Sequence, residues 1–217
     1  MSERRRIENL DFRGGLLCLD FVNTVGWHAS THPVEWLDSY ATLIGWSQRA
    51  KILPDQQLVA LLAYAQVNVD AALHVYRRAI QLREGIYRLF LSALHASPNS
   101  DNDLALLNRE HTAAVEQLRL VTTERRFALR WPEDSHALES PLWRVTRSAV
   151  DVLTSAALER VRMCAGPDCG WLFYDQSKNR SRKWCDSRDC GNRDRVRRHY
   201  RRSATVRAPQ SVPKPPL

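Results

Sequence analysis

The chain has 217 residues, 44% of them hydrophobic, and a formal net charge of +8 at pH 7. This length suits one large domain or one domain with a small module, and the hydrophobic content is enough for a core. The apolar run near the N-terminus is interrupted by Asp20 and is too short for a signal peptide or a membrane span. We therefore expect a cytoplasmic protein with no membrane partner, in which cysteines are thiols or metal ligands.

The positive charge is concentrated in one part of the sequence. Residues 1–159 carry 17 Lys and Arg against 19 Asp and Glu, whereas residues 160–202 carry 13 against 5. Clustered basic residues displace counterions from phosphates, so this pattern favours a polyanion-binding module attached to a near-neutral body. The alternative is a basic block that only aids solubility.

The first half of the chain predicts one strand and then helices. After a flexible N-terminus, residues 1–9, the segment FRGGLLCLDFVNTV predicts a turn and a buried strand in which Cys18 packs as a small hydrophobe. From Pro33 onward the apolar spacing becomes helical, and a second helical region covers about residues 55–96. The residues expected on these two apolar faces are Trp36, Tyr40, Leu43 and Ile44, then Leu73, Tyr76, Ile80, Tyr87 and Leu91.

Two more helices and a hairpin follow. A helix beginning near Asp101 carries His111 on its apolar stripe, where a satisfied half-buried histidine is expected rather than a functional one. The segment LVTTERRFALRW predicts a hairpin or two short strands. The next helix has Ser140 as the expected N-cap and Pro141 at its first position. The tail, residues 203–217, is rich in proline and is expected to be disordered.

Four of the five cysteines lie close together in the basic region. They form two C-x4-C pairs separated by fifteen residues: Cys164, Cys169, Cys185 and Cys190. Two short pairs on either side of a folded insert can wrap one tetrahedral ion, and four protein ligands leave no open position for catalysis. The spacing therefore predicts one structural Zn²⁺, with disulfides or unrelated thiols as alternatives.

The insert between the pairs predicts a small hairpin. An aromatic strand, 171–174, is followed by a polar turn and by a return strand that ends at Trp184. Gly166, Gly170 and Gly191 flank ligands where tight turns are expected. The fold class that follows is α+β, with a mainly helical N-terminal domain, residues 10–160, a few short strands, and a small treble-clef or ribbon-like zinc finger with four cysteine ligands, residues 161–202.

The segment CGNRDRVRRHYRR after the last cysteine predicts an arginine-rich helix. Asn192 is the expected N-cap, Asp194 is expected in the first turn, and Val196 with Tyr200 are expected to pack on the zinc module. The helix and the turn of the insert together present the candidate nucleic-acid-binding residues: Lys178, Arg180, Arg182, Lys183, Asn192, Arg193, Arg197, Arg198, Arg201 and Arg202.

Other uses of these residues stay open. The helix could be a solvated face or part of a protein-interaction module. Trp171 or Trp184 could stack on unpaired RNA bases, although both are expected in the core of the finger. His28 and His32, near Asp20 and Asn23, could line a small-molecule pocket, although surface positions are expected for loop histidines. No common catalytic motif occurs, so we expect no enzyme.

Two parts of the sequence resemble known families. The segment from Cys164 to Arg202 resembles the CGNR zinc finger, named for the residues that here are Cys190, Gly191, Asn192 and Arg193. The N-terminal part, with GGLLCLDFVNTV, resembles the ABATE domain that commonly precedes this finger in bacterial proteins. The resemblance implies a stress-induced transcription regulator, with the four cysteines as metal ligands and the finger as nucleic acid binder.

The function expected from these observations is a transcription regulator that binds nucleic acid through its basic finger. DNA is favoured over RNA, and the N-terminal domain is expected to sense a small-molecule effector or to form a homodimer. The ligand-binding residues of that domain are not identified by the sequence.

Overall fold

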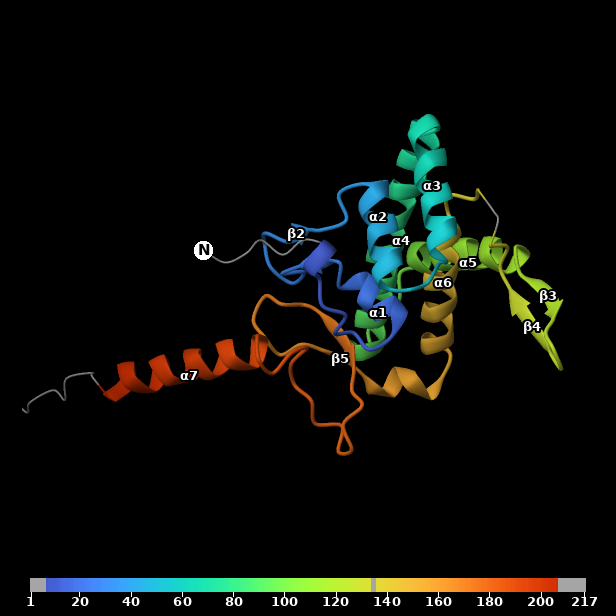
Figure 1. Ribbon diagram of the computed structural model, residues 1–217. Helices are drawn as coiled ribbons and strands as arrows, with labels where there is room; N and C mark the ends of the chain where they lie inside the picture. Colours follow the sequence, from blue (N-terminus) through green and yellow to red (C-terminus); the bar gives the residue numbers. More distant parts are fainter. Residues whose placement is uncertain (1–6, 134–135, 207–217) are drawn as a thin grey trace, which may run out of the picture.

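The computed structural model describes residues 7–133 and 136–206, and Figure 1 shows their arrangement. A body of helices packs around one hydrophobic core, the finger lies against its N-terminal part, and the last helix projects away from both. The elements before residue 100 are η1 (Ile7–Asn9), α1 (Leu17–Val22), β1 (Val25–Gly26), β2 (Val34–Glu35), α2 (Tyr40–Arg49), α3 (Asp55–Val67) and α4 (Val69–His95). Those after it are α5 (Asp101–Glu116), β3 (Arg119–Thr122), β4 (Phe127–Arg130), α6 (Ser140–Leu153), η2 (Ala156–Arg160), β5 (Val161–Met163), β6 (Leu172–Tyr174) and α7 (Cys190–Val206).

The predicted fold class is confirmed: the chain is mainly helical with short strands, followed by a zinc finger in which four cysteines cluster. The strands form three antiparallel pairs, β1–β2, β3–β4 and β5–β6. None of the individual helices in residues 7–133 and 136–206 combines the length and the hydropathy that a membrane-spanning segment needs. Helices α3 and α4 meet that criterion only as a pair, across a bend of 118°.

The strand predicted around Cys18 is wrong, because residues 17–22 form the short helix α1. Cys18, Leu19, Phe21 and Val22 are all buried, and a run buried on every side shows neither helical nor strand periodicity. The carboxylate of Asp20 accepts the backbone N–H of Gly14 at 2.7 Å, which ties the preceding Gly turn to the helix. Cys18 packs as a hydrophobe, as predicted, and burial raises the pKa of its thiol to about 12.

The long helical region divides into two helices. Helix α2 begins with a capping box between Ser39 and Thr42, so Trp36 lies before it rather than on its face. Asn68 separates α3 from α4. The buried face of α4 also differs from the predicted one: its fully buried residues include Val75, Ala79, Leu82, Ile86 and Phe90, whereas Leu73 is 39% exposed.

The hairpin predicted after α5 is confirmed, with Leu120 opposite Leu129 and Thr122 opposite Phe127. Helix α6 has Pro141 in its first turn, but it begins at Ser140, so the residue before it, Glu139, occupies the cap position. Two predictions about the ends extend beyond the described residues. In the N-terminal segment predicted to be flexible, residues 7–9 form η1 and Ile7 is buried. In the tail predicted to be disordered, residues 203–206 continue α7.

Candidate metal centre

The four clustered cysteines form one compact group of sulfur atoms. Their Sγ atoms all lie within 4.8 Å of one another, and the side chains are buried. Cys185 Sγ is 3.7 Å from Cys169 Sγ and 3.6 Å from Cys190 Sγ. Four sulfurs at about 2.3 Å from a tetrahedral zinc ion would be about 3.8 Å apart, whereas a disulfide needs about 2.05 Å. The donor set therefore fits one metal ion, and four thiolates in this geometry suit Zn²⁺.

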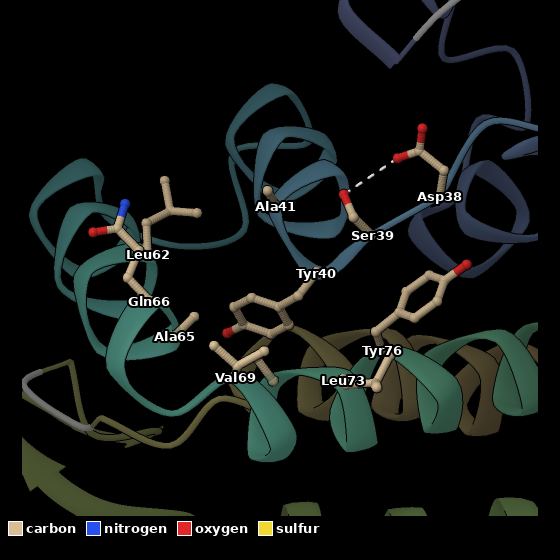
Figure 2. A pocket seen from close by; sticks show the side chains of 11 residues that line it. Asp38, Ser39, Tyr40, Ala41, Leu62, Ala65, Gln66, Val69, Leu73 and Tyr76 are labelled. Atoms are coloured by element: carbon tan, nitrogen blue, oxygen red, sulfur yellow. Dashed lines mark hydrogen bonds between the residues drawn. The ribbon is translucent and has the colours of Figure 1, made fainter.

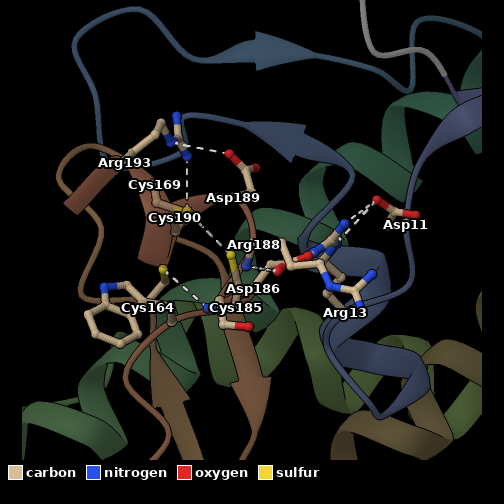
Figure 3. Close-up of polar contacts among 12 residues, drawn as sticks. Asp11, Arg13, Cys164, Cys169, Cys185, Asp186, Arg188, Asp189, Cys190 and Arg193 are labelled. Carbon is tan, nitrogen blue, oxygen red and sulfur yellow. Dashed lines mark hydrogen bonds and ion pairs between the residues drawn. The ribbon is translucent and has the colours of Figure 1, made fainter. Parts of the chain in front are cut away.

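Two strands and one helix position the ligands. Cys164 directly follows β5, and Cys169 precedes β6, so the first pair lies on the turn between two antiparallel strands. Cys185 follows the polar loop, and Cys190 is the first residue of α7. Figure 3 shows the four side chains meeting between these elements. One metal ion would thereby fix the start of α7 to the β5–β6 pair.

The return strand predicted to end at Trp184 is wrong. The partner of β6 is β5, which precedes the first cysteine, with Val161 opposite Tyr174. The loop after β6 is instead closed on Asp175, whose carboxylate accepts the backbone N–H groups of Ser177 at 2.8 Å and Arg182 at 3.0 Å. Because Asp175 captures both ends of the loop, the chain cannot extend into a second strand there.

Backbone geometry around the sulfurs matches the needs of thiolates. Cys164 Sγ accepts the N–H of Gly166 at 3.4 Å and of Cys185 at 3.3 Å. Gly170 has a φ of +69°, as a tight turn requires. Gly191 is inside α7 and makes no such turn.

The N-terminal segment binds the finger through backbone groups. The side chain of Asn23 donates to Leu172 O at 2.7 Å and accepts from Leu172 N at 2.9 Å. Trp171 Nε1 donates to Val25 O at 2.8 Å, and Tyr174 N donates to Gly14 O at 2.7 Å. The finger is therefore joined to the residues around α1. Sequence patterns carry no signal for such pairings between distant segments.

His28 holds the turn between the first two cysteines. Its backbone N donates to Cys169 O at 3.1 Å, and its ring stacks on Tyr87 with 3.7 Å between centroids. Tyr87 Oη donates to Gly170 O at 2.9 Å. His28 Nε2 lies 2.9 Å from a carboxylate oxygen of Glu84. His28 is thus an internal residue rather than the expected surface residue, whereas His32 is exposed.

The four residues considered for a small-molecule pocket do not share one site. Asp20 binds the Gly14 amide and Asn23 binds Leu172, while the two histidines differ in burial as described above. His111 is half-buried, as predicted, but its Nδ1 has no partner, which does not fit the expected satisfied role.

Arg193 and Arg182 make internal contacts. The guanidinium of Arg193 donates to Cys190 Sγ at 2.9 Å and pairs with Asp189 at 3.2 Å (Figure 3). It also lies over the Trp27 ring at 4.4 Å. Arg182 lies over the Phe173 ring at 4.3 Å and donates to backbone carbonyls that include that of Cys185. Both arginines therefore contact groups at the metal centre. Arg182 is half-buried, whereas the side chain of Arg193 is 42% exposed.

The remaining candidate residues lie on the loop and on α7. Lys178, Arg180 and Lys183 are exposed on the loop, and Arg180 pairs with Glu159 at 3.3 Å. On α7, Asp194 holds Arg197 at 2.7 Å and Arg198 at 3.0 Å. The side chain of Arg202 lies outside the described part of the chain, although its backbone is within α7.

Three expectations about α7 are wrong. The helix begins at Cys190, so Asn192 is its third residue and not its N-cap, and Asp194 lies beyond the first turn. Val196 and Tyr200 are 46% and 70% exposed, so they do not pack on the finger. The helix is held at its first turn by the metal ligand and by Arg193, and the rest projects into solvent (Figure 1).

The two tryptophans of the finger are enclosed to different degrees. Trp171 is 3% exposed, and its ring meets that of Trp36 edge to face. Trp184 is half-buried and packs against the core. Trp171 belongs to the core, as predicted, and Trp184 offers only part of its surface for stacking.

The comparisons with known proteins match two successive parts of the chain, and the boundary between them falls within η2. Residues 15–156 match the model of the ABATE family, described as "Putative stress-induced transcription regulator". Residues 160–203 match the model of the CGNR zinc finger. A search of the curated proteins found no match.

Proposed function

Because the chain belongs to the ABATE family and carries a CGNR zinc finger, we propose that it is a cytoplasmic transcription regulator that binds double-stranded DNA through α7 and the finger loop. Neither family description names a reaction, and the proposed role is not enzymatic. The observation that carries the proposal is the arginine-rich helix α7, which starts at a metal ligand and projects from the body.

The dimensions of α7 suit a DNA groove. Its 17 residues span about 25 Å, and a helix with side chains is about 10–12 Å wide, close to the width of the B-form major groove. The corresponding groove of double-stranded RNA is too narrow for side chains to read. Stacking on single-stranded RNA is disfavoured at the finger because Trp171 is buried. These observations favour duplex DNA.

The residues proposed to contact phosphates are the basic candidates of the finger loop and α7 other than Arg182 and Arg193, which contact the metal centre. They are Lys178, Arg180, Lys183, Arg197, Arg198, Arg201 and Arg202. Asn192 is exposed on the same helix and is proposed to contact DNA there. Arg182 and Arg193 are proposed to act through the metal centre and not as direct contacts.

Salt dependence of binding tests this proposal. We expect the zinc-loaded protein to bind duplex DNA with an affinity that falls steeply with salt, and Arg197→Ala with Arg201→Ala to reduce the logarithmic slope by about 2, since each phosphate contact contributes about 0.9. Lys51→Ala with Arg77→Ala, two exposed basic residues of the N-terminal body outside the hairpin, is the matched control. A zinc-loaded protein that binds neither DNA nor RNA at low salt contradicts the proposal and favours a protein-interaction module. Preference for structured RNA favours the RNA alternative.

We also propose that the N-terminal domain forms a homodimer through the β3–β4 hairpin. Leu120, Thr122, Phe127 and Leu129 lie on one face of the pair, because directly opposite residues share a face. The three apolar members are 61–72% exposed. We expect Phe127→Lys to shift sedimentation toward the monomer, with Arg119→Lys on the other face as control. A wild-type protein that sediments as a monomer at high concentration contradicts the dimer.

A further inference from the structure

An open pocket lies between α2, α3 and α4, on the N-terminal body and away from the finger. Its volume is about 350 Å³, which is within the range of small-molecule sites. Figure 2 shows Leu62 and Ala65 entering it from α3, Tyr40 from α2, and Leu73 and Tyr76 from α4. The bend between α3 and α4 at Asn68 produces this concave surface, because the two helices diverge there.

The wall of the pocket is apolar and contains no basic residue. Besides aliphatic side chains it has two tyrosine rings, whose hydroxyls donate to the backbone carbonyls of Leu138 and Leu37. The charged residue of the lining is Asp38, an exposed carboxylate at the rim. An anionic ligand would meet this carboxylate without a compensating cation, so the charge distribution selects neutral or cationic apolar molecules.

The surroundings of the pocket are unusually apolar for a solvent-exposed surface. Leu62 is 36% exposed, Val69 is 65% exposed and Leu73 is 39% exposed. In α3, Asp55 is the single charged residue, so the exposed apolar side chains of this helix are not covered by charged ones. Exposed apolar groups gathered around a concave surface typically mark a binding site.

A chain of hydrogen bonds starts at the wall of this pocket. Tyr76 Oη donates to Leu37 O at 3.0 Å, and the N–H of the same residue, Leu37, donates to a Glu35 carboxylate oxygen at 2.8 Å. The two oxygens of Glu35 accept from the buried guanidinium of Arg83 at 2.7 and 2.6 Å. The pocket wall is thereby connected to a charge pair in the middle of α4.

The same chain reaches the metal centre. Arg83 Nε donates to Glu84 at 2.9 Å, Glu84 binds His28, and the backbone N of His28 donates to the carbonyl of the metal ligand Cys169. Burial would raise the pKa of Glu84, but the hydrogen bond from His28 and the charge of Arg83 lower it to about 2. A ligand that displaces Tyr76 or Leu37 would therefore also shift the hydrogen-bonded groups at the turn that holds the first two cysteines.

We propose that this pocket binds a small apolar molecule that carries an amine group, and that its occupancy changes nucleic acid binding by the finger. The binding site stands on the pocket alone, and its effect on the finger rests on the proposed function. Aromatic faces and Asp38 provide the attraction for a cation, while the aliphatic walls accept the apolar body.

Two matched probes test the binding site on the full-length zinc-loaded protein. Phenethylamine and 3-phenylpropionate share an apolar ring and differ in the sign of charge. We expect calorimetry and NMR to show that the amine binds with a Kd of about 1 mM, as is usual for a fragment of this size. The acid should bind at least about fivefold more weakly, as expected for one unfavourable charge contact. Asp38→Asn should reduce this difference. Equal binding of both probes, stronger binding of the acid, or no binding of the amine overturns the proposal.

Two variants on one helix locate the bound probe. Ala65→Leu fills the pocket, whereas Ala63→Leu makes the same change at an exposed position outside the lining. We expect Ala65→Leu to weaken amine binding at least tenfold, which corresponds to about 1.4 kcal/mol of binding free energy, and Ala63→Leu to change it by less than about twofold. Ala41→Leu, at an exposed lining position on α2, repeats the test if Ala65→Leu does not fold. Equal loss in the filling and control variants places the probe elsewhere and overturns the site.

The effect on the finger is measured separately as DNA affinity with and without saturating amine. A change in affinity that Ala65→Leu abolishes supports the connection between the two sites, and the linkage must be reciprocal. Unchanged affinity with the pocket filled overturns the connection and leaves the site. Binding of the amine by a protein that binds no DNA overturns the proposed function instead.

Discussion

Arg193 stabilises the finger from two sides at once. Its guanidinium joins the Trp27 ring to the sulfur of Cys190. We expect Arg193→Ala to lower zinc affinity about tenfold, as is typical when a partner of a metal ligand is removed, and to lower the free energy of unfolding by about 1–2 kcal/mol. Competition with a chromophoric chelator and urea titration measure the two effects.

Lys178→Ala is the control for Arg193→Ala, because this side chain is exposed on the finger loop and has the same sign of charge. It should leave zinc affinity unchanged and reduce DNA binding. Equal zinc affinities for the two variants would show that Arg193 does not support the metal centre.

Asp20 gives the fold a dependence on pH. Burial raises its pKa to about 6, although the N–H groups of Gly14 and Gly15 oppose the shift. The folded state therefore holds the Asp20 proton more tightly than the unfolded state, where the pKa is about 3.9. As the pH rises from about 4 to 6, the free energy of unfolding should fall, and above pH 6 it should stay about 3 kcal/mol lower than at pH 4. Asp20→Asn should remove this dependence.

The measurement is the difference in unfolding free energy between the Asp20→Asn variant and the wild type at pH 4.5 and pH 7. Taking the difference cancels proton effects on the metal ligands, which the two proteins share. A difference that does not change with pH would show that Asp20 titrates normally in the fold.

At the residue scale, the sequence was sufficient for the metal ligands and insufficient for the arginines. Cys164 and Cys190 could be assigned because two cysteine pairs at short spacing on either side of a folded insert are typical of zinc sites. Arg193 looked equivalent to Arg197 on the helical wheel. Its partner Trp27 lies in a distant loop, and helical spacing contains no information on such a contact.

At the scale of elements, Gly170 is the residue on which the turn from β5 to β6, next to the ligand Cys169, depends. Its φ is +69°, and a Cβ there would lie 2.6 Å from the backbone N of Ala29. We expect Gly170→Ala to lower the unfolding free energy by at least about 2 kcal/mol, because strained backbone and a backbone clash are combined. Chemical denaturation of the zinc-loaded protein measures the loss.

Gly45→Ala is the matched control. This glycine lies inside α2, and its added Cβ would be 3.7 Å from Ile7 Cγ2, an ordinary contact. Alanine favours helix, so we expect stability to be equal or up to about 1 kcal/mol higher. Similar destabilisation of both variants would contradict the special role of the Gly170 turn.

Elements with clear periodicity were predicted and those without it were not. Helix α5 and the β3–β4 hairpin have polar and apolar residues in the expected order, so their types were correct. Helix α1 is buried on all sides, which removes the polar face that distinguishes helix from strand. The partner of β6 was predicted wrongly because Asp175 closes the following loop by local hydrogen bonds. The true partner, β5, has only three residues and directly precedes Cys164, so the sequence pattern did not reveal it.

At the scale of the whole molecule, metal binding should stabilise more than the finger. The residues around α1 bind the finger through Asn23, Val25 and Gly14, and His28 binds the turn at Cys169. We expect removal of zinc by a chelator to lower the Tm of the entire chain in one shifted calorimetric transition. Cys185→Ser should reproduce the effect without a chelator.

Two separate transitions, with the larger one unchanged by the chelator, would contradict this coupling. That result would mean that the N-terminal body is stable without the finger, and that the hydrogen bonds between them contribute little to its free energy of unfolding.

The pairing between Asn23 and Leu172 also has a consequence for how the protein is made. Asn23 directly follows α1, whereas Leu172, the residue to which its side chain binds, is synthesised 149 residues later. Until the cysteine-bearing segment has emerged, the N-terminal residues lack these hydrogen-bond partners, so we expect the segment around α1 to be less stably folded in the shorter chain. Nascent chains that stop before β6 should therefore be more sensitive to protease near α1 than chains that extend through α7.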